Sequence, residues 1–163
     1  MAQGPFDLVI ILGARVDALQ AIEATARAAA LVVVGRAAAA ASRLEHASVV
    51  LSRAVELARS TDDRSREADA LTWLANVVRQ QGRMADARDY AEQALGLRSV
   101  INETDGVALT ELGIVQRHTG AMDDAGATLE RALAIAREFG DQHSEINALG
   151  RACIHQRRAG PSR

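Results

Sequence analysis

Arginine recurs at a nearly regular interval along the chain, at Arg79, Arg117 and Arg157. A guanidinium group presents a planar fork of donors that matches the oxygens of carboxylates and phosphates. Three such groups in one row would favour an acidic peptide or a free chain terminus. The alternative is that arginine is simply this chain's ordinary exposed polar residue. The chain has 19 arginines and no lysine, so three of them can fall in a row by chance.

Motifs for catalysis or metal binding are absent from the sequence. There is no glycine-rich phosphate loop, no pair of histidines at helical spacing around a glutamate, and no pair of cysteines. Adjacent aspartates at 62–63 and 123–124 fit helix starts, where carboxylates interact favourably with the helix dipole. We therefore expect a protein that is not an enzyme and that uses no cofactor and no metal ion.

Composition and charge exclude further classes of function. The formal net charge of −2 argues against a general nucleic-acid binder, which needs many cationic contacts with phosphate. No apolar run reaches the roughly 18 residues that span a bilayer, and the N-terminus lacks the basic start of a secretory signal. The sequence predicts a cytoplasmic protein, of bacterial origin by its alanine and arginine usage, that contacts neither nucleic acid directly nor a membrane.

The elements that would position the arginines are indicated by internal repetition. Three leucines, a glycine and two alanines recur at one constant interval, and weaker copies of the pattern begin near Leu31 and Leu149. Repetition of this kind is typical of a solenoid, in which each unit buries its apolar face against its neighbours. The best-matched positions are Leu71, Leu74, Gly82, Ala87, Ala94 and Leu95, which recur as Leu109, Leu112, Gly120, Ala125, Ala132 and Leu133.

Each unit is predicted to be a pair of helices separated at a glycine. Gly82 and Gly120 end apolar-periodic stretches, and glycine readily adopts the left-handed conformation that closes a helix. Asp62 or Asp63 is the expected N-cap of the third helix. The chain is helix-forming from 17 to 42, and further helices are predicted at 44–60, 65–81, 84–101, 104–119, 122–139 and 142–158.

The first residues are the hardest to interpret. The apolar run at 1–16 is compatible with a strand or with the second helix of an incomplete preceding repeat, and we favour a helix. We therefore expect an N-terminal apolar segment at 1–24 and a helical repeat domain at 25–163, with about three repeats and a terminal helix. Such incomplete ends leave apolar faces uncovered, which predicts self-association through an uncapped terminus.

The repeated residues resemble the tetratricopeptide repeat (TPR) family. The resemblance rests on Leu71, Leu74, Ala75, Val78, Gly82, Ala87, Ala91 and Ala94, and on the same pattern one repeat later. The spacing, roughly 38 to 40 residues against about 34 in the basic repeat, is similar to the longer variety of the family, found in bacterial signalling and transcription regulators. The resemblance implies an all-α fold, a right-handed superhelical solenoid of helix-turn-helix repeats.

The same resemblance implies a concave groove lined by the first helix of each repeat, on the face opposite the leucines. Asn76 resembles the groove asparagine with which some members of the family hold a peptide backbone. Trp73 lies beside these positions, and both a binding role and a packing role are open for it. The candidate groove residues are Trp73, Asn76, Arg79, Gln80, Arg117, His118 and Arg157.

These expectations favour a non-catalytic protein–protein interaction module that binds a peptide or partner protein, acidic in character, in the groove. The chain would then be free-standing or a fragment of a larger bacterial regulator. The alternative function is a ligand-sensing or peptide-sensing regulatory subunit of a signalling or transcription system.

Overall fold

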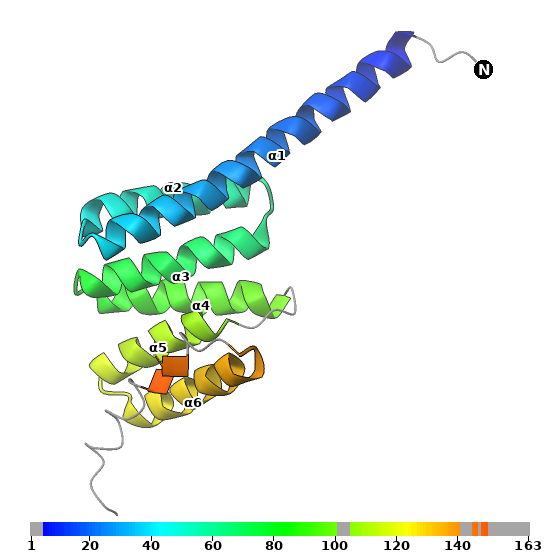
Figure 1. Ribbon diagram of the computed structural model, residues 1–163. Helices are drawn as coiled ribbons and strands as arrows, with labels where there is room; N and C mark the ends of the chain where they lie inside the picture. Colours follow the sequence, from blue (N-terminus) through cyan, green and yellow to red (C-terminus); the bar gives the residue numbers. More distant parts are fainter. Residues whose placement is uncertain (1–4, 101–104, 141–144, 147, 150–163) are drawn as a thin grey trace, which may run out of the picture.

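The computed structural model describes residues 5–100, 105–140, 145, 146, 148 and 149, with side chains described from Ile22 onward. Within these ranges, six helices form three successive helix pairs, stacked one on the next (Figure 1). The predicted all-α solenoid of helix pairs is confirmed. The helices are α1 (Pro5–Ala40), α2 (Leu44–Ser60), α3 (Arg64–Gln80), α4 (Met84–Val100), α5 (Gly106–His118) and α6 (Met122–Glu138).

The first helices of the pairs form one layer and the second helices form another. The backbone of α3 lies close to the backbones of both α1 and α5, whereas, over the part of the chain that the structure describes, the backbones of α2 and α4, and of α4 and α6, do not approach each other as closely. Helices α2 and α4 are joined by a side-chain hydrogen bond, from Arg59 Nη2 to Gln93 Oε1 at 3.3 Å. The first helices therefore lie closer together than the second helices. This difference places the first helices on the inner wall of the stack, where a groove is expected.

Helix α1 is the longest of the described helices, and its N-terminal half projects beyond the body of the solenoid (Figure 1). It runs unbroken through the expected boundary between 24 and 25, and the valines at 32–34 lie within it. The favoured helical interpretation therefore holds for residues 5–16. They extend the first helix of the first repeat and do not form the second helix of a preceding one. None of the described helices combines the length and apolarity that a membrane span requires.

The turn inside each helix pair uses a left-handed residue at the same position. The backbone φ angle is 59° at Ser42, 84° at Gly82 and 89° at Gly120. At the second turn, Gly82 N donates to Arg79 O at 2.9 Å and Arg83 N donates to Val78 O at 2.9 Å. The predicted role of Gly82 and Gly120 is confirmed, and the first repeat makes the same turn with a serine.

Substitutions at these turns should act on stability in opposite directions. We expect Gly82→Val to destabilise by about 1–2 kcal/mol, the usual cost of a side chain in the left-handed region. A Cβ at Gly82 meets no atom within 4 Å, so the cost is purely conformational. Ser42→Gly should stabilise by about 0.5 kcal/mol, because relief of strain exceeds the extra chain entropy of glycine. Urea unfolding measures both, and a neutral Gly82→Val would contradict the prediction.

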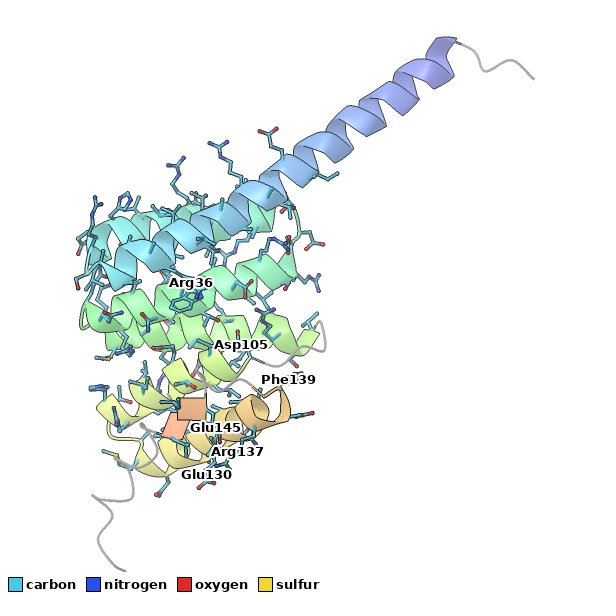
Figure 2. The ribbon with its side chains drawn as sticks, in the orientation of Figure 1. Arg36, Asp105, Glu130, Arg137, Phe139 and Glu145 are labelled. Atoms are coloured by element: carbon cyan, nitrogen blue, oxygen red, sulfur yellow. The ribbon has the colours of Figure 1, made fainter. Side chains whose placement is uncertain are left out.

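Aspartates cap two of the first helices. Asp63 accepts a hydrogen bond from Arg66 N at 3.1 Å at the start of α3, so the N-cap is Asp63 and not Asp62. Asp105, labelled in Figure 2, does the same for α5 by accepting from Ala108 N at 2.8 Å. Helix α5 therefore begins at Gly106, later than the predicted 104. Most of the predicted helix at 142–158 lies outside the described residues.

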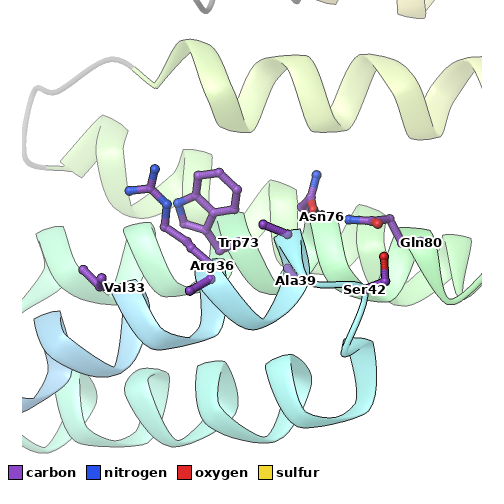
Figure 3. A pocket seen from close by; sticks show the side chains of 9 residues that line it. Val33, Arg36, Ala39, Ser42, Trp73, Asn76 and Gln80 are labelled. Carbon is purple, nitrogen blue, oxygen red and sulfur yellow. Dashed lines mark hydrogen bonds between the residues drawn. The ribbon is translucent and has the colours of Figure 1, made fainter.

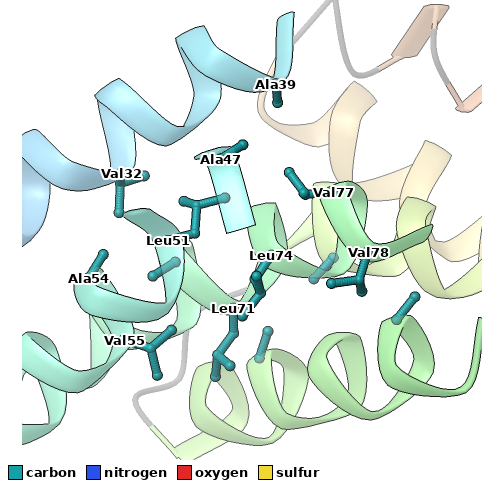
Figure 4. Packing of buried hydrophobic residues seen from close by; sticks show 14 of the residues in the cluster. Val32, Ala39, Ala47, Leu51, Ala54, Val55, Leu71, Leu74, Val77 and Val78 are labelled. Atoms are coloured by element: carbon teal, nitrogen blue, oxygen red, sulfur yellow. The ribbon is translucent and has the colours of Figure 1, made fainter. Parts of the chain in front are cut away.

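The core is built from alanine, leucine and valine, as Figure 4 shows for the first two repeats. Within each pair the two helices cross at one small residue. Gly35 faces Leu51 in the first pair, and Gly113 faces Leu129 in the third, so closely that an added Cβ would lie 2.5 Å and 2.7 Å from the respective leucine Cγ. In the second pair the equivalent residues by repeat position are both alanines, Ala75 and Ala91, which are fully buried.

Candidate functional site

A pocket of about 680 Å³ opens between the C-terminal half of α1 and the exposed side of α3 (Figure 3). One side is apolar and the other carries side-chain amides and a hydroxyl group. The pocket therefore offers both a surface for apolar groups and partners for hydrogen bonds. It is lined by Val33, Arg36, Ala37, Ala39, Ala40, Ser42, Trp73, Asn76 and Gln80.

The guanidinium group of Arg36 lies over the ring of Trp73, with 4.4 Å between the Arg36 Cζ atom and the ring centroid. This is a cation–π contact, of the order of 0.5–1 kcal/mol at an exposed site. Arg36 is exposed and Trp73 is partly buried. Among the described residues no carboxylate forms an ion pair with Arg36, which lines the pocket with its guanidinium group beside the indole (Figure 3).

At the other end of the pocket, two amides are hydrogen bonded to each other. Gln80 Nε2 donates to Asn76 Oδ1 at 2.6 Å, and Asn76 Nδ2 donates to Glu111 Oε1 on α5 at 2.8 Å. Glu111 therefore fixes which way the Asn76 amide points. Its NH₂ group faces α5 and its oxygen faces the Gln80 side.

Arg79 is held inside the protein by the same carboxylate. Arg79 Nε lies 2.7 Å from Glu111 Oε2, and the two side chains are only 13% and 9% exposed. Together with Asn76, this ion pair joins the second repeat to the third. The charge of Arg79 is neutralised by Glu111, so the guanidinium row expected from the sequence contributes less positive charge than three free arginines would.

A second polar cluster joins α3, α4 and α5. The buried Arg98 forms ion pairs with Asp69 and, at 3.4 Å from its Nε atom, with Asp105 Oδ2. Thr72 Oγ1 donates to the same Asp105 oxygen at 3.2 Å, and Arg98 Nη1 donates to Ser65 Oγ at 3.0 Å.

Within this cluster, burial raises the pKa of the Asp69 carboxyl, and the nearby Arg98 only partly offsets that effect. A raised carboxyl pKa is often a sign of a catalytic site. Here partial desolvation of the carboxyl within the cluster explains the raised pKa, because contact with the Arg98 guanidinium has the opposite effect. No group of three or more histidine, cysteine, aspartate or glutamate side chains within the described part of the chain could hold a metal ion.

The structure brings together three of the seven predicted groove residues. Trp73, Asn76 and Gln80 line the pocket, whereas Arg79 faces Glu111. Arg117 and His118 lie in the last turn of α5 and are not among the lining residues. Arg157 lies outside the described residues.

Two residues that shape the site, Arg36 and Glu111, are not among the seven candidate groove residues. Arg36 occupies the position equivalent to Asn76 in the preceding repeat, and Glu111 occupies the position equivalent to Trp73 in the following one. Comparison of equivalent positions places Arg36 on the groove face and Glu111 beside it, as it does Trp73. It would not have shown that Glu111 binds residues of the preceding repeat, because that contact depends on how the repeats stack.

Comparison with known proteins identifies the fold. One similar solved structure is the C-terminal TPR-containing domain of a Plasmodium falciparum protein described as an FK506-binding protein. It has a TM-score of 0.62 and 16% sequence identity, over 87% of this chain and 96% of that domain. Another is a Podospora anserina protein described as a kinesin light chain with nearly identical TPR-like repeats. Its TM-score is 0.54 at 16% identity, over 83% of this chain and 78% of that one.

No family model matches the sequence, and no curated relative matches it. At such low sequence identity the two structures show that the fold is TPR-like and do not by themselves assign a partner.

Proposed function

We propose that this chain is a non-catalytic protein–protein interaction module that binds an extended segment of a partner in the pocket between α1 and α3. The observation that carries the proposal is the partly buried Trp73 in the wall of a 680 Å³ pocket on the inner layer of first helices. Aromatic anchors in concave sites are enriched among the residues that dominate binding energy.

The dimensions of the pocket suit a short extended peptide. From Val33 to Ala40, α1 runs for about 10 Å at 1.5 Å per residue. This is the length of about three residues of extended chain. The exposed Val33, Ala37 and Ala40 supply apolar contact along one side. The Asn76 and Gln80 amides on the other side supply hydrogen-bonding groups for a peptide backbone.

The groove can extend beyond this pocket along the inner layer. Arg117 and His118, at the end of α5, and Arg157 further along the chain remain candidate contacts for a longer or acidic segment. We also propose that the repeats belong to the longer TPR variety. Equivalent helices begin at Leu44, Met84 and Met122, which is a wider interval than the roughly 34 residues of the basic repeat. A fragment of a bacterial cytoplasmic regulator is the context that this proposal favours.

A second candidate function is a regulatory subunit that senses a small ligand or peptide. It is favoured by Glu111, which couples the pocket residue Asn76 to the packing of the third repeat. Occupation of the pocket could then change how the second and third repeats stack.

The proposal predicts that a bulky residue in the pocket abolishes peptide binding. Ala37 is exposed and lines the pocket, so Ala37→Trp should fill it without disturbing the core. A library of immobilised peptides of about a dozen residues, probed with the purified chain, should give a set of binding peptides for the wild type. We expect Ala37→Trp to lose that set.

The matched control is Ala30→Trp, on the same helix at an exposed position outside the pocket lining. It should keep the wild-type peptides. If Ala37→Trp binds the same peptides as Ala30→Trp, the pocket is not the binding site. An equal helical circular dichroism signal for both variants excludes unfolding as the cause of a loss.

A further inference from the structure

The contact between the second and third repeats shows which chemical group binds an arginine on the groove face of this chain. On α5, Glu111 occupies the position equivalent to Trp73 on α3. Its carboxylate accepts from Arg79 at 2.7 Å and from Asn76 at 2.8 Å, both on the preceding first helix. At this junction a carboxylate of the protein itself therefore accepts hydrogen bonds from an arginine and from a side-chain amide.

The junction between the first and second repeats lacks that carboxylate. The residue at the Glu111 position is Trp73, and the residue at the Arg79 position is Ala39, whose small side chain leaves open space. A guanidinium group is nevertheless present, because Arg36 stands where the second repeat has Asn76. It rests on the Trp73 ring 4.4 Å away, and no described carboxylate forms an ion pair with it.

We infer that the partner supplies the missing carboxylate, as an aspartate or glutamate side chain of the bound segment, which binds Arg36 over Trp73. The inference rests on the proposed function and adds the chemistry of its partner. The aromatic ring supports the guanidinium plane and leaves the edge N–H donors available for two parallel hydrogen bonds to a carboxylate. Apolar side chains beside the acidic residue would contact Val33 and the indole (Figure 3).

A side-chain carboxylate fits better than a free chain terminus. Arg36 lies within the pocket, with Val33 one turn before it and Ala40 and Ser42 beyond it. A segment that crosses the pocket therefore continues past Arg36 in both directions, which a terminal carboxylate cannot do. Net charge also favours an anion here, because Arg36 is the one charged residue among those that line the pocket.

The test uses paired peptides and the single tryptophan as a reporter. Short leucine- and alanine-based peptides, acetylated and amidated at their ends, carry glutamate or aspartate at one internal position, and their twins carry glutamine or asparagine. A third set has the internal amide and a free C-terminus. Binding to the intact chain is followed by Trp73 fluorescence and by anisotropy of labelled peptides.

We expect the internal carboxylate to tighten binding about five- to tenfold over its amide twin, as one partly desolvated charged contact would. Arg36→Gln should reduce that ratio to about one. Arg53→Gln, which removes the same charge from an exposed position on α2 outside the pocket, should leave the ratio unchanged. High salt should lower the ratio in the wild type, because exposed charge contacts are screened.

Three results would overturn the inference. These are equal binding of the twins, a preference that survives Arg36→Gln, or a preference for the free C-terminus alone. The proposed function fails separately. If the acidic and amide peptides bind equally and Ala37→Trp abolishes the binding of both, the pocket is the binding site and the carboxylate preference is wrong. If no peptide of any set binds, both are wrong.

Discussion

Replacing Gly113 with valine should destabilise the protein by about 2–3 kcal/mol, the cost of inserting atoms into a packed helix crossing. A Cβ at Gly113 would lie 2.7 Å from Leu129 Cγ and 2.9 Å from its Cδ2. Leu129 is fully buried and cannot turn away, so α5 and α6 must separate. Urea unfolding monitored by circular dichroism should show the loss as a lower midpoint.

The chain offers a matched control for this substitution. Gly96 lies within α4, and a Cβ there meets no atom within 4 Å. Gly96→Val should therefore be neutral or slightly stabilising, since valine is a better helix former than glycine by a few tenths of a kcal/mol. Equal destabilisation by the two substitutions would show that the crossing at Gly113 is not the cause.

A compensating pair is already present in the second repeat, where Ala75 and Ala91 occupy the positions of Gly113 and Leu129. The double variant Gly113→Ala with Leu129→Ala recreates it. Leu129→Ala alone should cost about 2–5 kcal/mol through the cavity that it leaves. In the double variant the new methyl group fills part of that cavity, so we expect a favourable coupling of about 1 kcal/mol. Strictly additive effects would contradict this interpretation of the crossing.

Removing the Glu111 carboxylate should cost about 3–5 kcal/mol, because it leaves Arg79, whose side chain is only 13% exposed, without its ionic partner. Glu111→Ala removes the acceptor of both Arg79 and Asn76. The second and third repeats contact each other through this carboxylate. The substitution should therefore weaken the stacking of the third repeat on the second. A decrease in unfolding cooperativity should therefore accompany the lower midpoint.

The control for burial is an exposed ion pair of the same chain. Arg83 and Asp86 form an ion pair with side chains 54% and 42% exposed, so Arg83→Ala should change stability by less than about 1 kcal/mol. The double variant Arg79→Met with Glu111→Leu replaces the buried pair by apolar side chains and should recover most of the loss. If Glu111→Ala is as mild as Arg83→Ala, the pair does not join the repeats.

The repeat architecture follows from the amino-acid sequence alone. The recurrence of leucine, glycine and alanine at a constant interval predicts helix pairs, because those residue types report local geometry: apolar periodicity for a buried helix face and glycine for a left-handed turn. The predicted second helix at 44–60 coincides with α2, and Gly82 and Gly120 have the expected positive φ angles. By position within the repeat, Asn76 and Gln80 fall on the groove face and Trp73 lies beside it.

The stacking of the helices, in contrast, decides which side chains of one repeat meet those of the next. Arg79 and Arg36 are both groove arginines by repeat position, yet Arg79 is neutralised by Glu111 while Arg36 lies over Trp73 in the open pocket. Their different environments depend on residues of the following repeat, which are distant in sequence and come into contact only in the folded stack. Such contacts cannot be recognised in the local sequence. A charged residue on an exposed helix face occupies the same position in the repeat whether its partner belongs to the protein or to a ligand.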